Sequence, residues 1–578
     1  MSEKRPNRTA LFVVLGLAAV ATIASIGLIY SLLSGTTPSL DEPSVLEVTL
    51  DGGYADGKIE DPLAELGLSS SGNSLYDVVR AIDNAASDAN VEALRFTVRS
   101  PSLGLAQQQE IEQAVNRFRE SGKPVFSHLS GDMVTNGRYY LASMGDEVWA
   151  TPESFWLIQG LQADVTFLRG MLENLKIEPD VIMFKEYKSA GEPYKNTEMS
   201  EPMREALTTV LEDVQRMWIE GVAQRREIGV DAVRELVNAG ALTPQAAKDG
   251  KLVDHLGYAD ELTDAIKERL GRDSYERIKL SKYVQTLPEP DSDERIALIF
   301  GEGPILAEEA DDSNPFANNQ AIYGPKLARD IRKAAKEDRV KAIVLRVNSP
   351  GGSAVGSDYV WREIMRAKDK GIPVVVSMSS VAGSGGYWIS MGADAIVAQP
   401  ATITGSIGVV FSKLNVRGLY EWAGANIESI SLAENSSLMS PYHSFDEAQY
   451  ARVEGVIGSL YESFVNKVAE GRAMTFDEVE PLAHGRIWSG EDALDIKLID
   501  ELGGLREAVA LAATKASLDA ATTDVEIFPK TKSVFEKLAE GDFGVSTPST
   551  PTAAQLRTWI DELAQPRASV EMPDIRIY

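Results

Sequence analysis

Short runs of apolar residues alternate with amphipathic stretches along most of this 578-residue chain. In the second half, three of the runs are rich in β-branched residues, and two stretches between them carry apolar side chains at helical spacing. The runs are residues 295–300, 342–347 and 373–378, and the helical stretches are residues 323–338 and 358–370. This alternation predicts an α/β fold with a largely parallel sheet and crossover helices, and with active-site residues at the carboxyl ends of the strands.

The chain also repeats itself. Three segments of the first half recur in the second half at offsets of 249, 248 and 246 residues. They are residues 80–86 with 329–335, residues 139–152 with 387–400, and residues 249–257 with 495–503. We therefore predict a tandem duplication of one domain of roughly 240 residues, a usual size for α/β domains. The N-terminal repeat is expected at residues 44–290 and the C-terminal repeat at residues 291–525.

Ser384 is the first candidate for chemistry. It stands in the run Val-Ala-Gly-Ser-Gly-Gly-Tyr-Trp at residues 381–388, after a strand-like run and before a helix-like stretch. A sharp turn from strand to helix exposes a hydroxyl at a helix N-terminus, where a nucleophile is needed. Small-Ser-Gly turns are common in α/β proteins, so this motif alone is weak evidence.

The two repeats differ in a complementary way. Asn136 stands where the second repeat has Ser384, and Lys188 in the first repeat stands opposite Ser436. None of the four histidines lies in a turn with a hydroxyl nucleophile, so Lys188 is the candidate base. A lysine acts as a base only when neutral, which requires burial to lower its pKa from about 10.4. The alternative is an exposed lysine in a surface ion pair.

A glycine pair follows a strand of the second repeat only. Residues 349–353 read Ser-Pro-Gly-Gly-Ser, whereas the matching residues 100–104 keep the proline but lack the Gly-Gly pair. Gly351 and Gly352 let backbone N–H groups point into a site, where such donors stabilise an oxyanion by roughly 3–4 kcal/mol. The alternative is a tight turn before a helix, without any chemistry.

Four motifs together carry a family resemblance. They are Tyr-Lys-Ser-Ala-Gly-Glu-Pro at residues 187–193, the run at residues 349–353, Ser-Gly-Gly-Tyr-Trp at residues 384–388 and Thr-Gly-Ser-Ile-Gly at residues 404–408. With them the chain resembles the long, duplicated form of the S49 serine peptidases, the signal peptide peptidase A (protease IV) type. The resemblance runs over roughly residues 10–525 and leaves the tail at residues 526–578 without a counterpart.

The resemblance implies a role for each candidate residue. Ser384 would be the nucleophile and Lys188 the general base. Backbone groups at Gly351, Gly352 and Gly385 would lie near the oxyanion, and Ser406 would orient the lysine. It further implies a ClpP/crotonase fold, a homotetramer on the membrane, and remnant signal peptides and other apolar peptides as substrates. No metal or cofactor is expected, because the chain has no cysteine and its histidines are scattered.

The N-terminus predicts one transmembrane helix. Residues 10–33 carry no charge over 24 positions, which is close to the length that spans a bilayer. Basic residues precede this segment and acidic residues follow it, so residues 1–9 are expected in the cytoplasm and the bulk outside a bacterial inner membrane. Residues 34–43 would link the anchor to the first repeat. The alternative is a cleaved signal peptide.

The formal charge of −29 argues against nucleic acid as a partner. Two further function classes remain open at this point. One is a crotonase-like enzyme that acts on acyl-thioesters, which would not need Lys188 or an anchor. The other is a non-catalytic membrane scaffold. The complementary loss of the serine and the lysine between the repeats argues against both.

Overall fold

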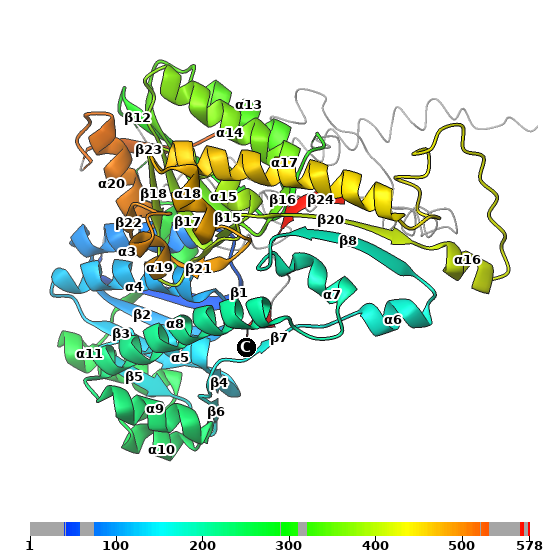
Figure 1. Cartoon of the computed structure of the whole chain (residues 1–578). Coiled ribbons are helices and arrows are strands. Elements are labelled where there is room, and N and C mark those ends of the chain that lie inside the picture. Colours follow the sequence, from blue (N-terminus) through cyan, green and yellow to red (C-terminus); the bar gives the residue numbers. More distant parts are fainter. Residues whose placement is uncertain are drawn as a thin grey trace, which may run out of the picture.

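Two largely parallel sheets, one from each half of the chain, form the centre of the molecule (Figure 1). The structure is a computed structural model that describes residues 40, 42–57, 74–288, 291–309, 321–520, 522–530, 567–571 and 576–577. The two sheets share the same order of corresponding strands. The predicted α/β tandem duplication is therefore confirmed.

The N-terminal sheet has the order β10-β5-β3-β2-β1-β11, and all of its strands are parallel. Its strands are β1 (Ser44–Gly53), β2 (Val91–Ser102), β3 (Val125–Leu129), β5 (Glu147–Ala150), β10 (His255–Leu256) and β11 (Glu276–Lys279). The helices of this repeat include α3 (Leu75–Ser87), α4 (Leu105–Glu120), α5 (Asn136–Ala142), α6 (Arg169–Asn174), α8 (Glu201–Arg226), α9 (Val230–Ala239) and α11 (Ala259–Leu270).

The C-terminal sheet has the order β21-β19-β17-β15-β12-β23, and β18 also pairs with β17 while β22 pairs with β18. The path β22-β18-β17-β15-β12-β23 therefore repeats the N-terminal order, and the additional strand β21 is antiparallel to β19. Its strands are β12 (Arg295–Glu302), β15 (Val340–Ser349), β17 (Val374–Gly383), β18 (Ala395–Ala398), β19 (Ile403–Gly405), β21 (Ile487–Ser489), β22 (Glu501–Leu502) and β23 (Asp524–Ile527). Its helices include α13 (Gly324–Ala334), α14 (Ala354–Asp369), α15 (Gly385–Trp388), α17 (Glu447–Gly471) and α20 (Leu505–Lys515).

The central strands β15 and β17 lie in the interior because their sequences are almost continuously apolar. In β15 and β17 almost every side chain is buried, as expected for parallel strands that are covered by helices on both faces. The next helix begins at a side-chain cap, because the Ser353 hydroxyl accepts a hydrogen bond of 3.1 Å from the N–H of Gly356. Strand β15 therefore leads through the glycine pair directly into α14.

A third sheet joins the two repeats, with the order β14-β13-β16-β24-β20-β8. Its members are β8 (Glu178–Phe184), β13 (Ile305–Leu306), β14 (Ile322–Tyr323), β16 (Gly351–Ser353), β20 (Val409–Asn415) and β24 (Arg567–Glu571). Strand β8 of the first repeat pairs antiparallel with β20 of the second, from Phe184 with Val409 to Glu178 with Asn415. These two strands extend side by side away from the central sheets (Figure 1).

A buried polar cluster also connects the repeats. Arg346 of β15 donates hydrogen bonds to Asp56 at 2.9 Å and to Glu110 of α4 at 2.5 Å. Each of these three residues is at most 3% exposed. The repeats are therefore joined by charge pairing and strand pairing in addition to apolar contacts.

Residues 10–33, where the sequence predicts a transmembrane helix, lie outside the described residues. Within the described ranges, none of the helices combines the length and the apolar character needed to cross a bilayer.

Candidate active site

Ser384 lies in a strained turn between β17 and α15. Its φ of 56° and ψ of −112° are unusual for a residue with a side chain, and such strain costs of order 1–3 kcal/mol. The turn is held because the Ser384 N–H donates to the Gly405 carbonyl at 2.8 Å. The flanking glycines are needed for space: a Cβ on Gly386 would lie 2.6 Å from the carbonyl oxygen of Ser349. The strand-to-helix turn that the sequence predicts at Ser384 is therefore present.

Lys188 reaches this turn from the other repeat. Its Nζ lies 2.6 Å from the Oγ of Ser384, and the same Nζ lies 3.1 Å from both the carbonyl oxygen and the Oγ of Ser406. Lys188 and Ser406 are each 1% exposed, and Ser384 is fully buried. The alternative of an exposed lysine in a surface ion pair is therefore wrong, because the pairing of β8 with β20 carries Lys188 into the interior.

The segment around Lys188 is fixed to the C-terminal repeat by several contacts. The Tyr187 N–H donates to the His484 carbonyl at 3.0 Å, and Lys185 pairs with Glu480 at 2.7 Å. The His484 ring lies between Glu480 and Glu186, at 2.7 and 2.9 Å. The hydrogen bond from Lys185, followed in size by the one from His484, lowers the pKa of Glu480 and keeps this carboxylate ionised.

Two glycines make room for the lysine, and the sequence analysis missed both. A Cβ on Gly485 would lie 2.5 Å from the Cα and the backbone nitrogen of Lys188, and Gly485 has a φ of +84°. A Cβ on Gly408 would lie 3.0 Å from the Cδ of Lys188. Gly408 is part of the Thr-Gly-Ser-Ile-Gly motif, so its place in that motif was the available signal. Nothing in the local sequence singles out Gly485.

Gly351 and Gly352 form β16, which lies against the Ser384 turn. Their φ angles are 108° and 149°, which a residue with a side chain rarely adopts. A Cβ on Gly385 would lie 3.0 Å from the nitrogen of Gly352, so the two glycine segments are in close approach. The Gly351 N–H is 3.2 Å from the Oγ of Ser349. All six sequence-predicted site residues therefore come together around one turn.

Comparison with known proteins identifies the family. The model of "Peptidase family S49" matches residues 117–272 and 366–519. The chain is 33% identical to "Serine protease SPPA, chloroplastic" of Arabidopsis thaliana, over 82% of this chain and 69% of that protein. It is 34% identical to "Protease 4" of Salmonella typhi, over 77% of this chain and 72% of that protein. A "Putative signal peptide peptidase SppA" of Enterococcus faecium is 35% identical over 39% of this chain and 64% of that protein.

The chain belongs to peptidase family S49. It is accordingly a serine peptidase. The first matched segment of the S49 model contains Lys188, and the second contains Ser384 and Ser406. The two candidate function classes outside proteolysis, an acyl-thioester enzyme and a non-catalytic scaffold, are therefore set aside.

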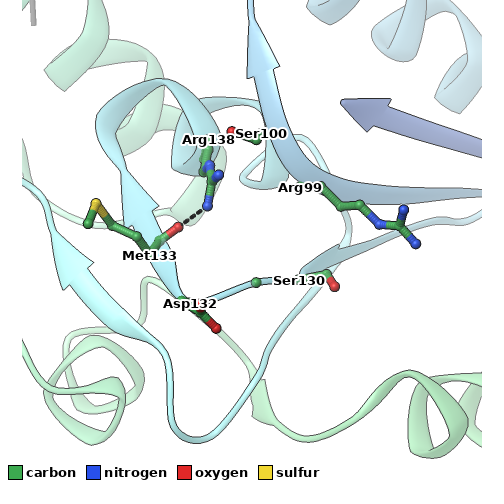
Figure 2. Close-up of a pocket in the computed structure, with 7 residues that line it drawn as sticks. Arg99, Ser100, Ser130, Asp132, Met133 and Arg138 are labelled. Carbon is green, nitrogen blue, oxygen red and sulfur yellow. Dashed lines mark hydrogen bonds between the residues drawn. The ribbon is translucent and has the colours of Figure 1, made fainter. Parts of the chain in front are cut away.

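The N-terminal repeat of this S49 peptidase has a different structure at the matching turn. Asn136 occupies this turn, and its Oδ1 accepts a hydrogen bond of 3.0 Å from the backbone N–H of Gln159. A pocket of about 420 Å³ lies beside this turn, and Figure 2 shows Arg138 directed at the Met133 carbonyl while Arg99 extends away from both. The pocket is lined by Arg99, Ser100, Ser130, Gly131, Asp132, Met133 and Arg138. It shares no residue with the site around Ser384.

No metal site competes with this assignment in the described ranges, where no group of three or more His, Asp or Glu side chains is arranged to hold an ion.

Proposed function

We propose that the chain is an endopeptidase with a Ser–Lys dyad, in which Ser384 is the nucleophile and Lys188 the general base. The observation that carries the proposal is the buried contact of 2.6 Å between the Lys188 Nζ and the Ser384 Oγ. Burial disfavours the charged form of an amine, and a neutral lysine is the form that accepts a proton. The wider ClpP/crotonase-type architecture belongs to the same proposal.

The contacts of the lysine suit a neutral amine. Its two N–H groups donate to the carbonyl and the hydroxyl of Ser406, both at 3.1 Å. Its lone pair is then directed at the Ser384 hydroxyl, which donates its proton. Ser406 acts in this proposal as a positioning residue, because it fixes the direction of the lone pair without touching the substrate.

The mechanism follows from this arrangement. The Ser384 Oγ attacks the peptide carbonyl carbon while its proton passes to the Lys188 Nζ. The carbonyl oxygen becomes an oxyanion, which accepts hydrogen bonds from backbone N–H groups of Gly351, Gly352 and Gly385. The lysine gives the proton to the leaving amine as the C–N bond breaks. Water, deprotonated by the lysine, then attacks the acyl carbon of the acyl-enzyme. The bond between that carbon and the Ser384 Oγ breaks, the carboxylic acid product leaves, and the lysine returns the proton to the Ser384 Oγ.

We infer that the substrates are remnant signal peptides and other apolar peptides released in the membrane. The uncharged segment at residues 10–33 supports a single-pass anchor in a bacterial inner membrane, with the catalytic bulk in the periplasm. The name of the relative from Enterococcus faecium supports the same substrate class. The homotetramer implied by the family resemblance completes this proposal.

A synthetic signal peptide tests the substrate class. The full-length protein in detergent is incubated with the peptide, and the products are identified by mass spectrometry. Internal cleavage in the apolar region by the wild type, absent with Ser384→Ala, is the expected result. Intact peptide, with cleavage only of soluble polar peptides, would contradict it. Carbonate extraction of membranes tests the anchor: the full chain should stay in the pellet, and a variant without residues 1–39 should be released.

A further inference from the structure

Residues 484–486 contact both the proposed base and its positioning residue through their main chain. The first carbonyl of this segment, at His484, accepts a hydrogen bond of 3.0 Å from the N–H of the residue before Lys188. The last carbonyl, at Arg486, accepts a hydrogen bond of 2.7 Å from the N–H of Ser406. A shift of this segment would therefore move the lysine and the serine that orients it together, away from the nucleophile.

The main chain of this segment has a conformation that its own sequence does not favour. His484 has a φ of 52°, in the left-handed region that a residue with a side chain rarely adopts. Gly485 follows with a φ of +84° and packs against the backbone of Lys188. A backbone of this kind persists only where the surrounding contacts fix it. The contacts of the His484 side chain therefore help to determine where the segment lies.

The His484 ring lies between two carboxylates, one from each repeat. Its Nδ1 is 2.9 Å from the Oε1 of Glu186, and its Nε2 is 2.7 Å from the Oε1 of Glu480. Burial alone would raise the pKa of Glu186, but its own backbone N–H and the His484 ring outweigh burial and lower it. An ionised carboxylate only accepts hydrogen bonds, so both contacts are satisfied when each ring nitrogen carries a proton. That form of the ring is positively charged.

Two further titratable groups face His484 among the described residues. Lys185 pairs with Glu480 at 2.7 Å, on the same oxygen that the ring contacts. The Tyr461 hydroxyl of α17 accepts a hydrogen bond of 3.4 Å from the backbone N–H of His484, so it binds the main chain and not the ring. Glu480 therefore keeps a cation when the ring is neutral. The contact with Glu186, two residues before Lys188, is the one that depends on the proton on Nδ1.

We propose that His484 is a positioning residue for Lys188, and that the charged form of its ring joins Glu186 of the N-terminal repeat to Glu480 of the C-terminal repeat beside the base. This inference rests on the proposed function of the dyad. The two groups place opposite demands on pH. Lys188 accepts a proton only when it is neutral, so kcat rises with pH on the acid side. His484 positions it only when charged, so kcat falls again as the ring loses its proton, and the profile is bell-shaped.

Substitutions of His484 in the full-length chain test the proposal with an apolar fluorogenic peptide. His484→Arg is charged at every pH used and its guanidinium can donate to both carboxylates, so it should keep activity and lose the alkaline limb of the kcat profile. His484→Gln has no charge to lose. Its kcat at the wild-type optimum should be roughly tenfold lower, with KM unchanged and the alkaline limb absent.

The matched control is His255→Gln, because His255 lies 3.9 Å from the carboxylate of Glu147 in the N-terminal sheet. This variant should keep the wild-type pH profile. A purely structural role of His484 would lower activity by the same factor at every pH. An alkaline limb that persists in both His484→Arg and His484→Gln would overturn the proposal.

The ring also gives a readout that needs no catalysis. The chain has four histidines, so the NMR resonance that is missing from carbon-13 histidine-labelled His484→Gln belongs to His484. In full-length Ser384→Ala this resonance should titrate over the pH range of the alkaline limb of the wild type. Titration outside that range would overturn the positioning role. Failure of the proposed dyad is seen separately, as peptide cleavage that persists in Ser384→Ala.

Discussion

The contact of Arg346 with the N-terminal repeat should be essential for holding the two halves of the proposed active site together. Arg346 is 2% exposed, and its guanidinium donates to Asp56 and Glu110 of the other repeat and to the hydroxyls of Ser377 and Ser379. Burial opposes its charge, but Glu110 and Asp56 outweigh burial and raise the pKa of the guanidinium. The arginine is therefore charged at every pH at which the protein is folded.

The substitution Arg346→Leu leaves the two buried carboxylates without their cation. Breaking a buried ion pair from one side costs about 3–5 kcal/mol, because the remaining charge stays desolvated. The matched control is Arg169→Leu, which removes a pair with Glu173 in α6 whose side chains are 33% and 57% exposed. A pair of that kind contributes about 0.3–0.5 kcal/mol. Arg346→Leu should therefore lower the free energy of unfolding about ten times as much as Arg169→Leu does.

Urea titration followed by both peptide cleavage and circular dichroism measures the effect. In Arg346→Leu, activity should disappear at a lower urea concentration than in the wild type, because Lys188 and Ser384 come from different repeats. Adding Asp56→Asn and Glu110→Gln to Arg346→Leu removes the unpaired charges and should recover most of the loss. An Arg346→Leu midpoint equal to that of Arg169→Leu would refute the reasoning.

Three further predictions follow from single positions. Burial raises the pKa of Glu302 from 4.5 to about 7. Between these two pH values the folded state binds a proton that the unfolded state has lost, so the free energy of unfolding falls by about 3 kcal/mol as the pH rises. Glu302→Gln should therefore be more stable than the wild type in urea at pH 8 but not at pH 4, and an equal difference at both pH values would contradict the assignment. Gly485→Ala should lower kcat/KM about a hundredfold, because the added Cβ displaces Lys188. The control Gly424→Ala should keep the wild-type kcat/KM, since Gly424 has a similar φ of +87° but an added Cβ there would have no neighbour within 4 Å. Equal activity of the two variants would argue against a displaced lysine. Ser406→Ala removes one hydrogen bond to the lysine. If the transition state loses about 1.5–3 kcal/mol of stabilisation, kcat should fall ten- to hundredfold at unchanged KM. A wild-type kcat in this variant would exclude a positioning role for Ser406.

Local sequence was sufficient to predict the central elements. The run at residues 342–347 lies within β15, and the run at residues 373–378 overlaps β17, because buried parallel strands need apolar side chains on both faces. The helical stretch at residues 358–370 overlaps α14, which begins four residues earlier, at Ala354. The Ser353 cap sets that start, and helical spacing alone does not reveal it.

The candidate site was predictable in its residues but not in its assembly. Comparison of the repeats indicated Ser384 and Lys188, since each repeat lacks what the other has. The pairing of β8 with β20, which brings them together, joins segments more than 200 residues apart and leaves no local signal. Strand β24 was missed for a related reason. Its sequence Arg-Ala-Ser-Val-Glu has no apolar run, and its position depends on main-chain pairing with two other strands.

Cleavage of a short apolar fluorogenic peptide by single alanine variants tests the split dyad most directly. Folding of each variant is checked by circular dichroism, and Lys195→Ala, an exposed lysine seven residues from Lys188, serves as the matched control. We predict that Ser384→Ala and Lys188→Ala each lower kcat by about 10³-fold or more, while Lys195→Ala keeps the wild-type rate. A folded Lys188→Ala variant that still cleaves the peptide at the wild-type rate would show that the base lies elsewhere and would contradict the account.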